Sequence, residues 1–236
     1  MIALIPARSG SKRVKDKNIR DLGGWPLMRW TVETAKQCGF EKIIVSSDSE
    51  DYLKMAWAWG VEGVLRPPEF CQDSSTDADA INHAILWYRI EPGRDIIVYL
   101  RPTTPFRTVT LIKTAIETFR NAGENATSLR SVEEMTESAL KCFEVSHFGF
   151  LKPIAKSMID ANLPNQLVPK TYKGNGYIDI IKPQQALTGD LWGDKCIGFI
   201  TPRTVEIDTE YDFWYAEKWL QRERLFDWGK EEHGPA

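Results

Sequence analysis

Short runs of aliphatic and β-branched residues alternate along the first half of the chain with longer segments whose apolar residues recur at helical spacing. Such alternation is typical of βαβ units, which build a mainly parallel sheet with helices packed on its faces. The pattern therefore predicts an α/β fold. The runs that predict strands are 2–5, 42–46, 63–65 and 96–100, and the segments that predict helices are 26–38, 50–59, 77–88 and a stretch that includes 111–119.

Residues with strong preferences for helix ends support these boundaries. Pro26 suits the first position of a helix, and Gly39 suits the position just after one. Ser49 and Thr76 can each accept a hydrogen bond from a free backbone N–H of a first turn, so both are predicted to cap helices. Gly60 is expected to end the helix that Ser49 begins.

The pattern changes between about Ser131 and Gly174. Short extended pieces, a hairpin expected about Gly149 and three prolines replace the regular alternation there. We interpret the 236 residues as a single domain with an inserted lobe at about 131–174. Beyond the lobe the pattern predicts strands at 177–181 and 196–200, an amphipathic helix from 213 to about 226, and a frayed tail at 230–236.

Composition and charge narrow the classes of partner. Hydrophobic residues make up 42% of the chain, which is enough to build a core. The formal net charge is -3, and acidic and basic residues are mixed along the whole length. No basic stripe of the kind that neutralises nucleic-acid phosphates is present in the sequence, so we expect no nucleic-acid partner.

The cysteines and the first residues indicate the compartment. The four cysteines lie far apart and form no C-x-x-C pair, which argues against a zinc knuckle and against a redox motif. The apolar run at the N-terminus reaches only Ile5 before Pro6 and Arg8 interrupt it, and it is too short for a signal peptide or a membrane span. We expect a reduced, cytoplasmic protein with no membrane partner.

A loop rich in small residues and cations follows the first predicted strand. Residues 6–18 contain five cations beside serines and one glycine, Gly10. Small side chains let backbone N–H groups approach phosphate oxygens, and the cations stabilise the charge of a departing pyrophosphate. The loop lies at the edge of the sheet where open α/β folds bind ligands. It matches neither a Walker A loop nor a G-x-G-x-x-G motif, and a solvated basic loop is the alternative interpretation.

Several motifs in a fixed order resemble one family. The strings IPARSGSKRVKDKNI, GGWPLMRWTVETA and KIIVSSDSE are similar to the opening of the CMP-N-acylneuraminate synthetases, cytidylyltransferases that also serve related nonulosonic acids. Further matches follow at LRPPEF, the 73–77 region, LRPTTPFRT, GNGYIDIIK and VEIDTEYDF. The resemblance covers nearly the whole chain, which makes it more specific than any single motif.

This resemblance implies a fold, a reaction and an assembly. The fold would be a Rossmann-like, mainly parallel sheet flanked by helices. The enzyme would transfer CMP from CTP, with Mg²⁺, to the anomeric hydroxyl of an acidic sugar and release pyrophosphate. The sugar hydroxyl would attack the α-phosphorus directly, and two copies of the chain would form a homodimer through the inserted lobe.

The resemblance also implies roles for individual residues. The implied nucleotide-binding residues are Arg8, Ser11, Lys12, Lys17, Asn18 and Arg66, of which Arg8 and Lys17 are also implied in catalysis, together with Asp208. The implied sugar-binding residues are Arg101, Thr103, Lys141, Gln166 and Asn175. The implied metal ligands are Glu206 and Asp208.

The acidic segment 206–208 permits two interpretations. In an extended segment Glu206 and Asp208 share one face, so both carboxylates could reach one hard cation such as Mg²⁺. Alternatively these acids simply precede a helix, because Thr209 is a natural N-cap and Asp212 can complete a capping box. We assign the structural role to Asp212 and metal binding to Asp208, which is also the candidate acceptor of the sugar proton.

Three departures from the family pattern concern the sugar. Arg101 stands where the family has a glutamine, and Asp179 stands where it has an aromatic residue. Asn165 replaces an arginine that can hold the sugar carboxylate, although Lys141 and Lys170 are near these motifs. We therefore expect an acidic sugar other than plain N-acetylneuraminic acid. The alternatives are a nucleotidyltransferase for another sugar or sugar phosphate, and a nucleotide-binding protein without catalytic activity.

Overall fold

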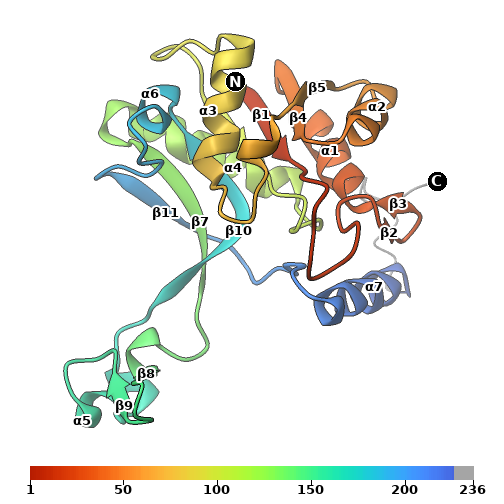
Figure 1. Ribbon diagram of the computed structural model, residues 1–236. Helices are drawn as coiled ribbons and strands as arrows, with labels where there is room; N and C mark the ends of the chain where they lie inside the picture. The colour runs from red at the N-terminus through yellow and green to blue at the C-terminus, as the bar shows by residue number, and fades with distance from the viewer. Residues whose placement is uncertain (226–236) are drawn as a thin grey trace.

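The computed structural model describes residues 1–225, which form a seven-stranded sheet with helices on both faces (Figure 1). The strand order is β11-β7-β10-β6-β1-β4-β5, and only β10 runs antiparallel to its neighbours. The strands are β1 (Ile2–Pro6), β4 (Lys42–Ser47), β5 (Glu62–Leu65), β6 (Ile97–Tyr99), β7 (Ser128–Glu134), β10 (Tyr172–Ile181) and β11 (Cys196–Ile200). The predicted α/β fold with a mainly parallel sheet is confirmed.

The longer helices follow the sequence pattern closely. They are α1 (Leu27–Gln37), α2 (Glu50–Ala58), α3 (Asp77–Tyr88), α4 (Val109–Ala122) and α7 (Glu210–Leu225). The hydroxyl of Ser49 accepts from the N–H of Tyr52, and Thr76 forms a capping box with Asp79, so both predicted caps are confirmed. Pro26 is the N-cap of α1 rather than its first residue. The last helix begins three residues earlier than predicted, because Thr209 and Asp212 cap it.

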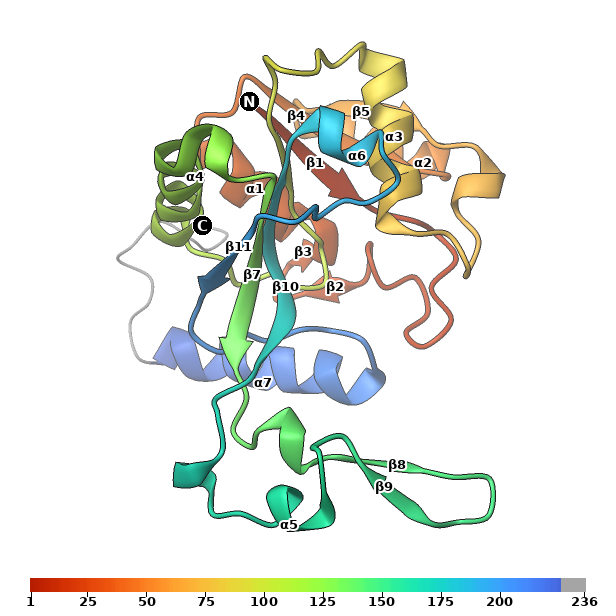
Figure 2. The same cartoon turned by 90° about the vertical axis from the view of Figure 1, so that its left-hand side faces the viewer.

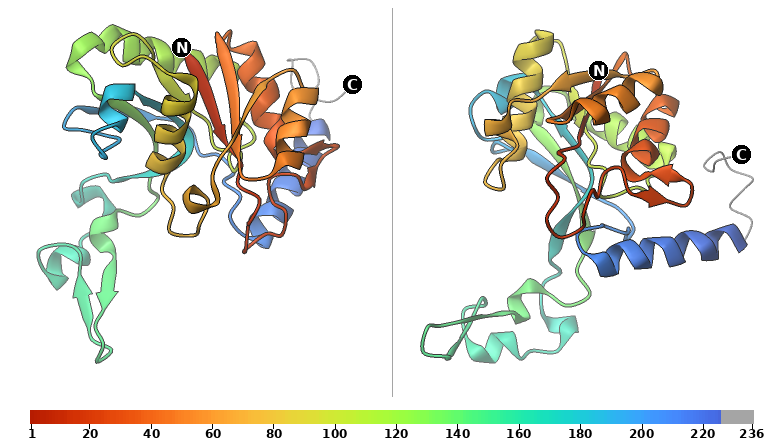
Figure 3. Two further views of the ribbon diagram at one scale, coloured as in Figure 1. Left: turned by 45° about the horizontal axis from the view of Figure 1, so that its top comes forward. Right: turned by 45° about the vertical axis from the view of Figure 1, so that its right-hand side comes forward.

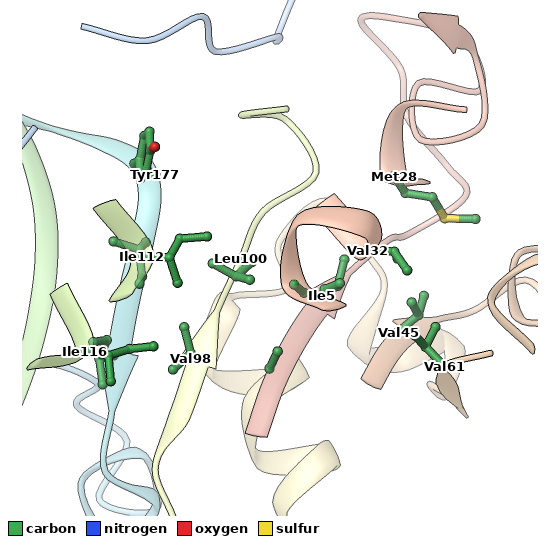
Figure 4. Close-up of a cluster of buried hydrophobic side chains, with 14 of the residues drawn as sticks. Ile5, Met28, Val32, Val45, Val61, Val98, Leu100, Ile112, Ile116 and Tyr177 are labelled. Atoms are coloured by element: carbon green, nitrogen blue, oxygen red, sulfur yellow. The ribbon is translucent and has the colours of Figure 1, made fainter. Parts of the chain in front are cut away.

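Alternation along the strands places two separate apolar layers on the sheet. Ala3 and Ile5 of β1 face α1, α2 and α4, whereas Ile2 and Leu4 face α3 and the short helix α6 (Pro183–Ala186). Figure 4 shows the first layer, in which side chains from β1, β4, β6, α1 and α4 point toward one another. A third cluster joins α7 to α1 and includes the fully buried Phe213. These three clusters pack the helices against the sheet.

The chain leaves the sheet between β7 and β10 and forms a separate lobe (Figures 1 and 2). Because β7 reaches Glu134 and β10 starts at Tyr172, the lobe comprises residues 135–171, and the outer residues of the predicted insertion belong to the sheet. Its hairpin turns at Gly149, as the sequence predicted, with φ at +81°. The lobe elements are η3 (Ala139–Lys141), β8 (Phe143–Val145), β9 (Leu151–Pro153), α5 (Met158–Ala161) and η4 (Asn165–Leu167).

Minor elements complete the description. They are β2 (Asp21–Leu22), β3 (Trp25–Pro26), η1 (Pro68–Phe70) and η2 (Gly123–Asn125). The predicted tail at 230–236 lies outside the described residues. No helix within residues 1–225 is long and apolar enough to cross a membrane.

The strand order places a crevice beside β1. From β1 the chain proceeds outward through β4 to β5, and it then returns to form β6 on the opposite side of β1. In open α/β sheets, ligands bind at the carboxyl ends of the strands where the order reverses in this way. The loop after β1 emerges at this point and extends toward α7 (Figure 3).

Candidate active site

A polar pocket of about 280 Å³ opens at the crevice between β1 and β6. All six residues that the sequence analysis assigned to the nucleotide line it, namely Arg8, Ser11, Lys12, Lys17, Asn18 and Arg66. Arg101 and Thr103, assigned to the sugar, line it from the loop after β6. The structure therefore brings together residues that lie far apart in the sequence.

The loop after β1 is held in shape by two polar anchors. The side-chain amide of Asn18, which is 5% exposed, donates to the carbonyl oxygen of Arg8 at 2.9 Å. Asp48, at the end of β4, accepts from both the N–H and the hydroxyl of Ser9 at 2.8 and 3.0 Å. This role of Asp48 was not predicted from the sequence, because a polar residue just before a helix has an ordinary structural explanation.

Asp73 neutralises the outer cations of this loop. Its carboxylate contacts Arg8 Nη1 at 3.2 Å and also forms an ion pair with Lys12. Arg8 donates to the carbonyl oxygen of Gln72 as well, at 3.0 Å. The hydrogen bond from Lys12 is the largest of the effects that lower the pKa of Asp73. A bound phosphate group would therefore exchange places with this carboxylate.

Asp208 neutralises two other cations of the loop in the same way. Its Oδ1 lies 3.2 Å from Lys17 Nζ and 3.3 Å from Arg13 Nη2. Lys17 also donates to the carbonyl oxygen of Ile207 at 2.9 Å, and its side chain is only 12% exposed. These contacts join the loop after β1 to the acidic segment across about 190 residues of sequence.

The acidic segment has the geometry that alternation predicts. Val205 and Ile207 are buried, while Glu206 and Asp208 point to the other side. The N–H of Ile207 donates to the carbonyl oxygen of Thr103 at 2.8 Å, which places the segment beside the pocket. Partial burial, and then the negative charge of Asp208, raise the pKa of Glu206. Such like-charged neighbours favour a bound cation.

The donor set of this segment fits Mg²⁺. Within residues 1–225 no group of three or more His, Cys, Asp and Glu side chains could hold a metal by itself. Mg²⁺ in nucleotide sites is commonly held by one or two carboxylates, with phosphate oxygens and waters as its other ligands. Glu206 and Asp208 supply that number of hard oxygen ligands. The pair therefore suits a cation that arrives with a nucleotide.

Asp212 has the capping role that the sequence predicted. Its Oδ2 accepts from the N–H groups of Thr209 and Asp208 at 2.7 and 3.1 Å, and its own N–H donates to the Thr209 hydroxyl. The first turn of α7 is thus capped without the Asp208 side chain. Asp208 is left free to face the loop cations.

Arg107 is a buried residue that the sequence analysis missed. Its side chain donates to the carbonyl oxygens of Arg101, Thr104 and Tyr177, and to that of Gly176 at 2.9 Å. It also donates to the hydroxyl of Thr31 at 3.1 Å, and it is 3% exposed. Burial lowers the pKa of the guanidinium, and the surrounding acceptors hold its charge. Arg107 therefore fixes the loop after β6 against the middle of β10.

The remaining sugar-site residues are distributed differently. Asn175 is buried, and its side-chain amide donates to the Thr201 hydroxyl at 2.6 Å. Lys141 and Gln166 lie in the lobe, where Lys141 donates to Asn165 at 2.9 Å. The described residues that line the pocket do not include these two lobe residues. Within one chain, the lobe extends away from the central sheet and its helices (Figure 1).

Sequence comparisons connect the chain with characterised proteins. Residues 2–148 match the family described as "Cytidylyltransferase". An N-acylneuraminate cytidylyltransferase of Escherichia coli is 31% identical over 217 residues, covering 90% of this chain and 50% of that protein. A CMP-N,N'-diacetyllegionaminic acid synthase of Legionella pneumophila is 32% identical over 233 residues, covering 94% of this chain and 96% of that protein. The chain thus spans at most about half the length of N-acylneuraminate cytidylyltransferases such as the Escherichia coli protein, but nearly all of the Legionella protein.

Comparison with solved structures supports the fold. A CMP:2-keto-3-deoxy-manno-octonic acid synthetase complexed with CTP matches with a TM-score of 0.70 and 18% identity, covering 94% of this chain and 98% of that chain. A 4-diphosphocytidyl-2C-methyl-D-erythritol synthase from Anaerococcus prevotii matches with a TM-score of 0.65 and 14% identity, covering 94% and 96%. At these identities the likeness concerns the fold alone.

Proposed function

Because this chain belongs to the cytidylyltransferase family, we propose that it transfers CMP from CTP to the anomeric hydroxyl of an acidic, nonulosonic-type sugar with release of pyrophosphate. The observation that carries the proposal is the pocket at the β1/β6 crevice, where the nucleotide-binding residues implied by the sequence converge. We infer the class of the acceptor sugar from the names of the relatives. Both named groups of relatives act on acidic sugars of this kind.

We assign some residues of the site to binding of the nucleotide and others to the transfer reaction. Arg8, Lys12 and Lys17 hold the phosphates and stabilise the charge of the departing pyrophosphate. Glu206 and Asp208 would hold Mg²⁺, which when bound polarises phosphate oxygens and makes the α-phosphorus more electrophilic. We assign Asn18 and Arg66 to binding of the ribose and base of the nucleotide. Asp208 is also the candidate acceptor of the proton of the attacking sugar hydroxyl.

A substrate panel tests this proposal. We expect pyrophosphate release with CTP, Mg²⁺ and a modified nonulosonic acid, at a higher rate than with N-acetylneuraminic acid, because Arg101, Asn165 and Asp179 alter the sugar site. Each nucleoside triphosphate is assayed against each sugar. Turnover of only neutral sugars or sugar phosphates would contradict the acidic acceptor. CTP binding without turnover of any sugar in the panel would instead indicate a nucleotide-binding protein.

The lobe supports a homodimer as part of the proposal. Phe148, Phe150 and Ile159 are 82, 72 and 77% exposed, and large apolar side chains gathered on an extended lobe are typical of an interface. The interface would also give Lys141 and Gln166 a way to act in sugar binding, since a lobe can reach the pocket of a second copy. We infer a cytoplasmic setting, supported by four cysteines that are free thiols within residues 1–225.

We expect the parent protein to be a dimer and Phe148→Ser to shift it toward monomer. Serine removes most of the apolar area that the exposed phenyl ring would bury between two lobes. Light scattering at several protein concentrations measures the mass. Leu86→Ser is the matched control, because Leu86 is 72% exposed on α3, outside the lobe. A monomeric parent, or a dimer equally weakened by both substitutions, would contradict the lobe interface.

A further inference from the structure

The pocket wall beyond the phosphate loop contains an ion-pair network from three elements. Arg101, after β6, donates from one terminal nitrogen to Asp179 in β10 at 2.5 Å and from the other to Asp77 at the start of α3 at 2.6 Å. The hydroxyl of Tyr99 donates to the second oxygen of Asp77 at 2.9 Å, and the guanidinium lies over the Tyr99 ring. We call Asp77, Arg101 and Asp179 the triad.

The triad borders the place where the proposed reaction would occur. A Cβ atom added at Gly176 would lie 3.6 Å from Cδ of Arg101 and 3.3 Å from a carboxylate oxygen of Glu206, so both side chains border the same glycine. If Glu206 helps to hold the metal at the α-phosphate, as the proposed function requires, then the triad faces the acceptor sugar.

The arrangement leaves Arg101 unsuited to hold an anion. Each terminal nitrogen of its guanidinium already donates to a carboxylate, so its charge is balanced within the pocket wall by Asp77 and Asp179 and attracts an incoming carboxylate only weakly. Arg130 lies opposite Asp179 on the neighbouring strand β7. Its guanidinium, however, lies over the Trp192 ring, with Cζ 4.4 Å from the ring centroid. The exposed member of the triad is Asp77, whose side chain is 40% exposed at the pocket.

Burial of the Asp179 carboxylate, the third member of the triad, costs folding free energy. Asp179 is 1% exposed, and its Oδ1 has no hydrogen-bond partner within residues 1–225. Burial raises the pKa of this carboxyl, although the Arg101 charge opposes the effect. An aliphatic side chain in the same strand position would avoid this cost. Perturbed, incompletely paired carboxyl groups of this kind concentrate at functional sites.

We propose that the triad determines which acceptor sugar is used, and that Asp77 accepts a hydrogen bond from a hydroxyl, amine or amide N–H of that sugar. Asp179 acts as a positioning residue, since it holds Arg101 away from the sugar and neutralises it. The site then favours a hydrogen-bond-donating substituent at this point and disfavours an anionic one. This inference rests on the proposed transfer to a sugar.

Matched pairs of acceptors test the triad. Each pair consists of one nonulosonic acid with a hydroxyl or amine at a given carbon and the same sugar with hydrogen there. We expect the parent to prefer the donor-bearing member of at least one pair, and Asp77→Ser to reduce that ratio of kcat/KM by about tenfold or more, the scale of a hydrogen bond to a charged group. Asp179→Asn should change the ratio in the same direction. The KM for CTP should change less than the sugar ratio in both variants.

The controls separate this inference from the proposed function. Asp51→Ser removes an exposed acid from the first turn of α2, outside the pocket, and should leave the ratio unchanged. An active parent whose ratio is unaltered in both triad variants would overturn the inference while the transferase proposal stands. A raised KM for CTP with an unchanged sugar ratio would also overturn it, because the triad would then bind the nucleotide. A parent inactive with every sugar would refute the proposed function itself.

Discussion

Asp208→Asn is expected to lower the rate of pyrophosphate release by on the order of a hundredfold or more, the scale lost when one electrostatic element of a transition state is removed. The substitution keeps the shape of the side chain and removes its charge. An amide is a poor ligand for Mg²⁺ compared with a carboxylate, so the Mg²⁺ concentration needed for half-maximal rate should rise. The melting temperature should change little, because the Asp208 side chain is 42% exposed and Lys17 keeps its hydrogen bond to the Ile207 carbonyl oxygen.

The capping contacts of α7 make this variant informative. Because Asp212 and Thr209 cap the helix, a loss of activity in Asp208→Asn cannot be attributed to a weakened helix start. Glu210→Gln is the matched control, since it removes a neighbouring carboxylate that pairs with Arg20 at 2.6 Å, and neither residue lines the pocket. Rates are measured against Mg²⁺ concentration for all three proteins. Near-parent turnover with unchanged metal dependence in Asp208→Asn would end the metal-ligand assignment.

Arg107→Leu is expected to lower the free energy of unfolding by about 3 kcal/mol or more. The substitution leaves several buried carbonyl oxygens without a donor, and each such loss costs about 1–3 kcal/mol before relaxation. For a protein of this length, a loss of that size corresponds to a fall in melting temperature of roughly 6–12 °C. Activity should fall as well, because Arg101 and Gly176 lose the contact that holds their backbones together.

Unfolding by urea and by heat measures the effect of Arg107. Arg120→Leu is a suitable control, since Arg120 is exposed in the last turn of α4 and its charge is not surrounded by backbone acceptors. Arg107→Lys should recover only a small part of the loss, because an ammonium group cannot donate in the directions that the planar guanidinium uses. Equal unfolding curves for the parent and Arg107→Leu would show that the loops are held by other contacts.

Local features of the fold were readable from the sequence, and long-range ones were not. Ser49 and Thr76 act on N–H groups a few residues away, so their capping roles follow from the residue type and its neighbours. The antiparallel direction of β10 depends on how the chain returns from the lobe, and nothing in residues 177–181 records it. The true edges of the lobe were hidden for the same reason, since pairing with β7 extends the strand back to Tyr172.

In the site, too, contacts between residues close in sequence were predictable and contacts between distant residues were not. The loop after β1 was predicted as a phosphate site because its cations and small residues are adjacent in sequence, and the structure gathers those residues in one pocket. The partners of these cations come from distant segments, as Asp73 and Asp208 do. Arg107 was missed because its acceptors are main-chain oxygens, which carry no signature in the sequence. The final arginine of LRPTTPFRT was the available clue.

Carboxylates that already occupy the phosphate loop make nucleotide capture an exchange reaction. Asp73 and Asp208 must release Arg8, Lys12 and Lys17 before these cations can bind phosphates. Asp73 and Asp208 contact different cations, so we expect a triphosphate that spans the loop to replace both carboxylates, whereas a single inorganic phosphate would replace one. If the loop binds phosphates as proposed, it should therefore favour a triphosphate over inorganic phosphate. In a cell, where free phosphate is abundant, such internal counterions would keep the proposed nucleotide pocket available for the triphosphate.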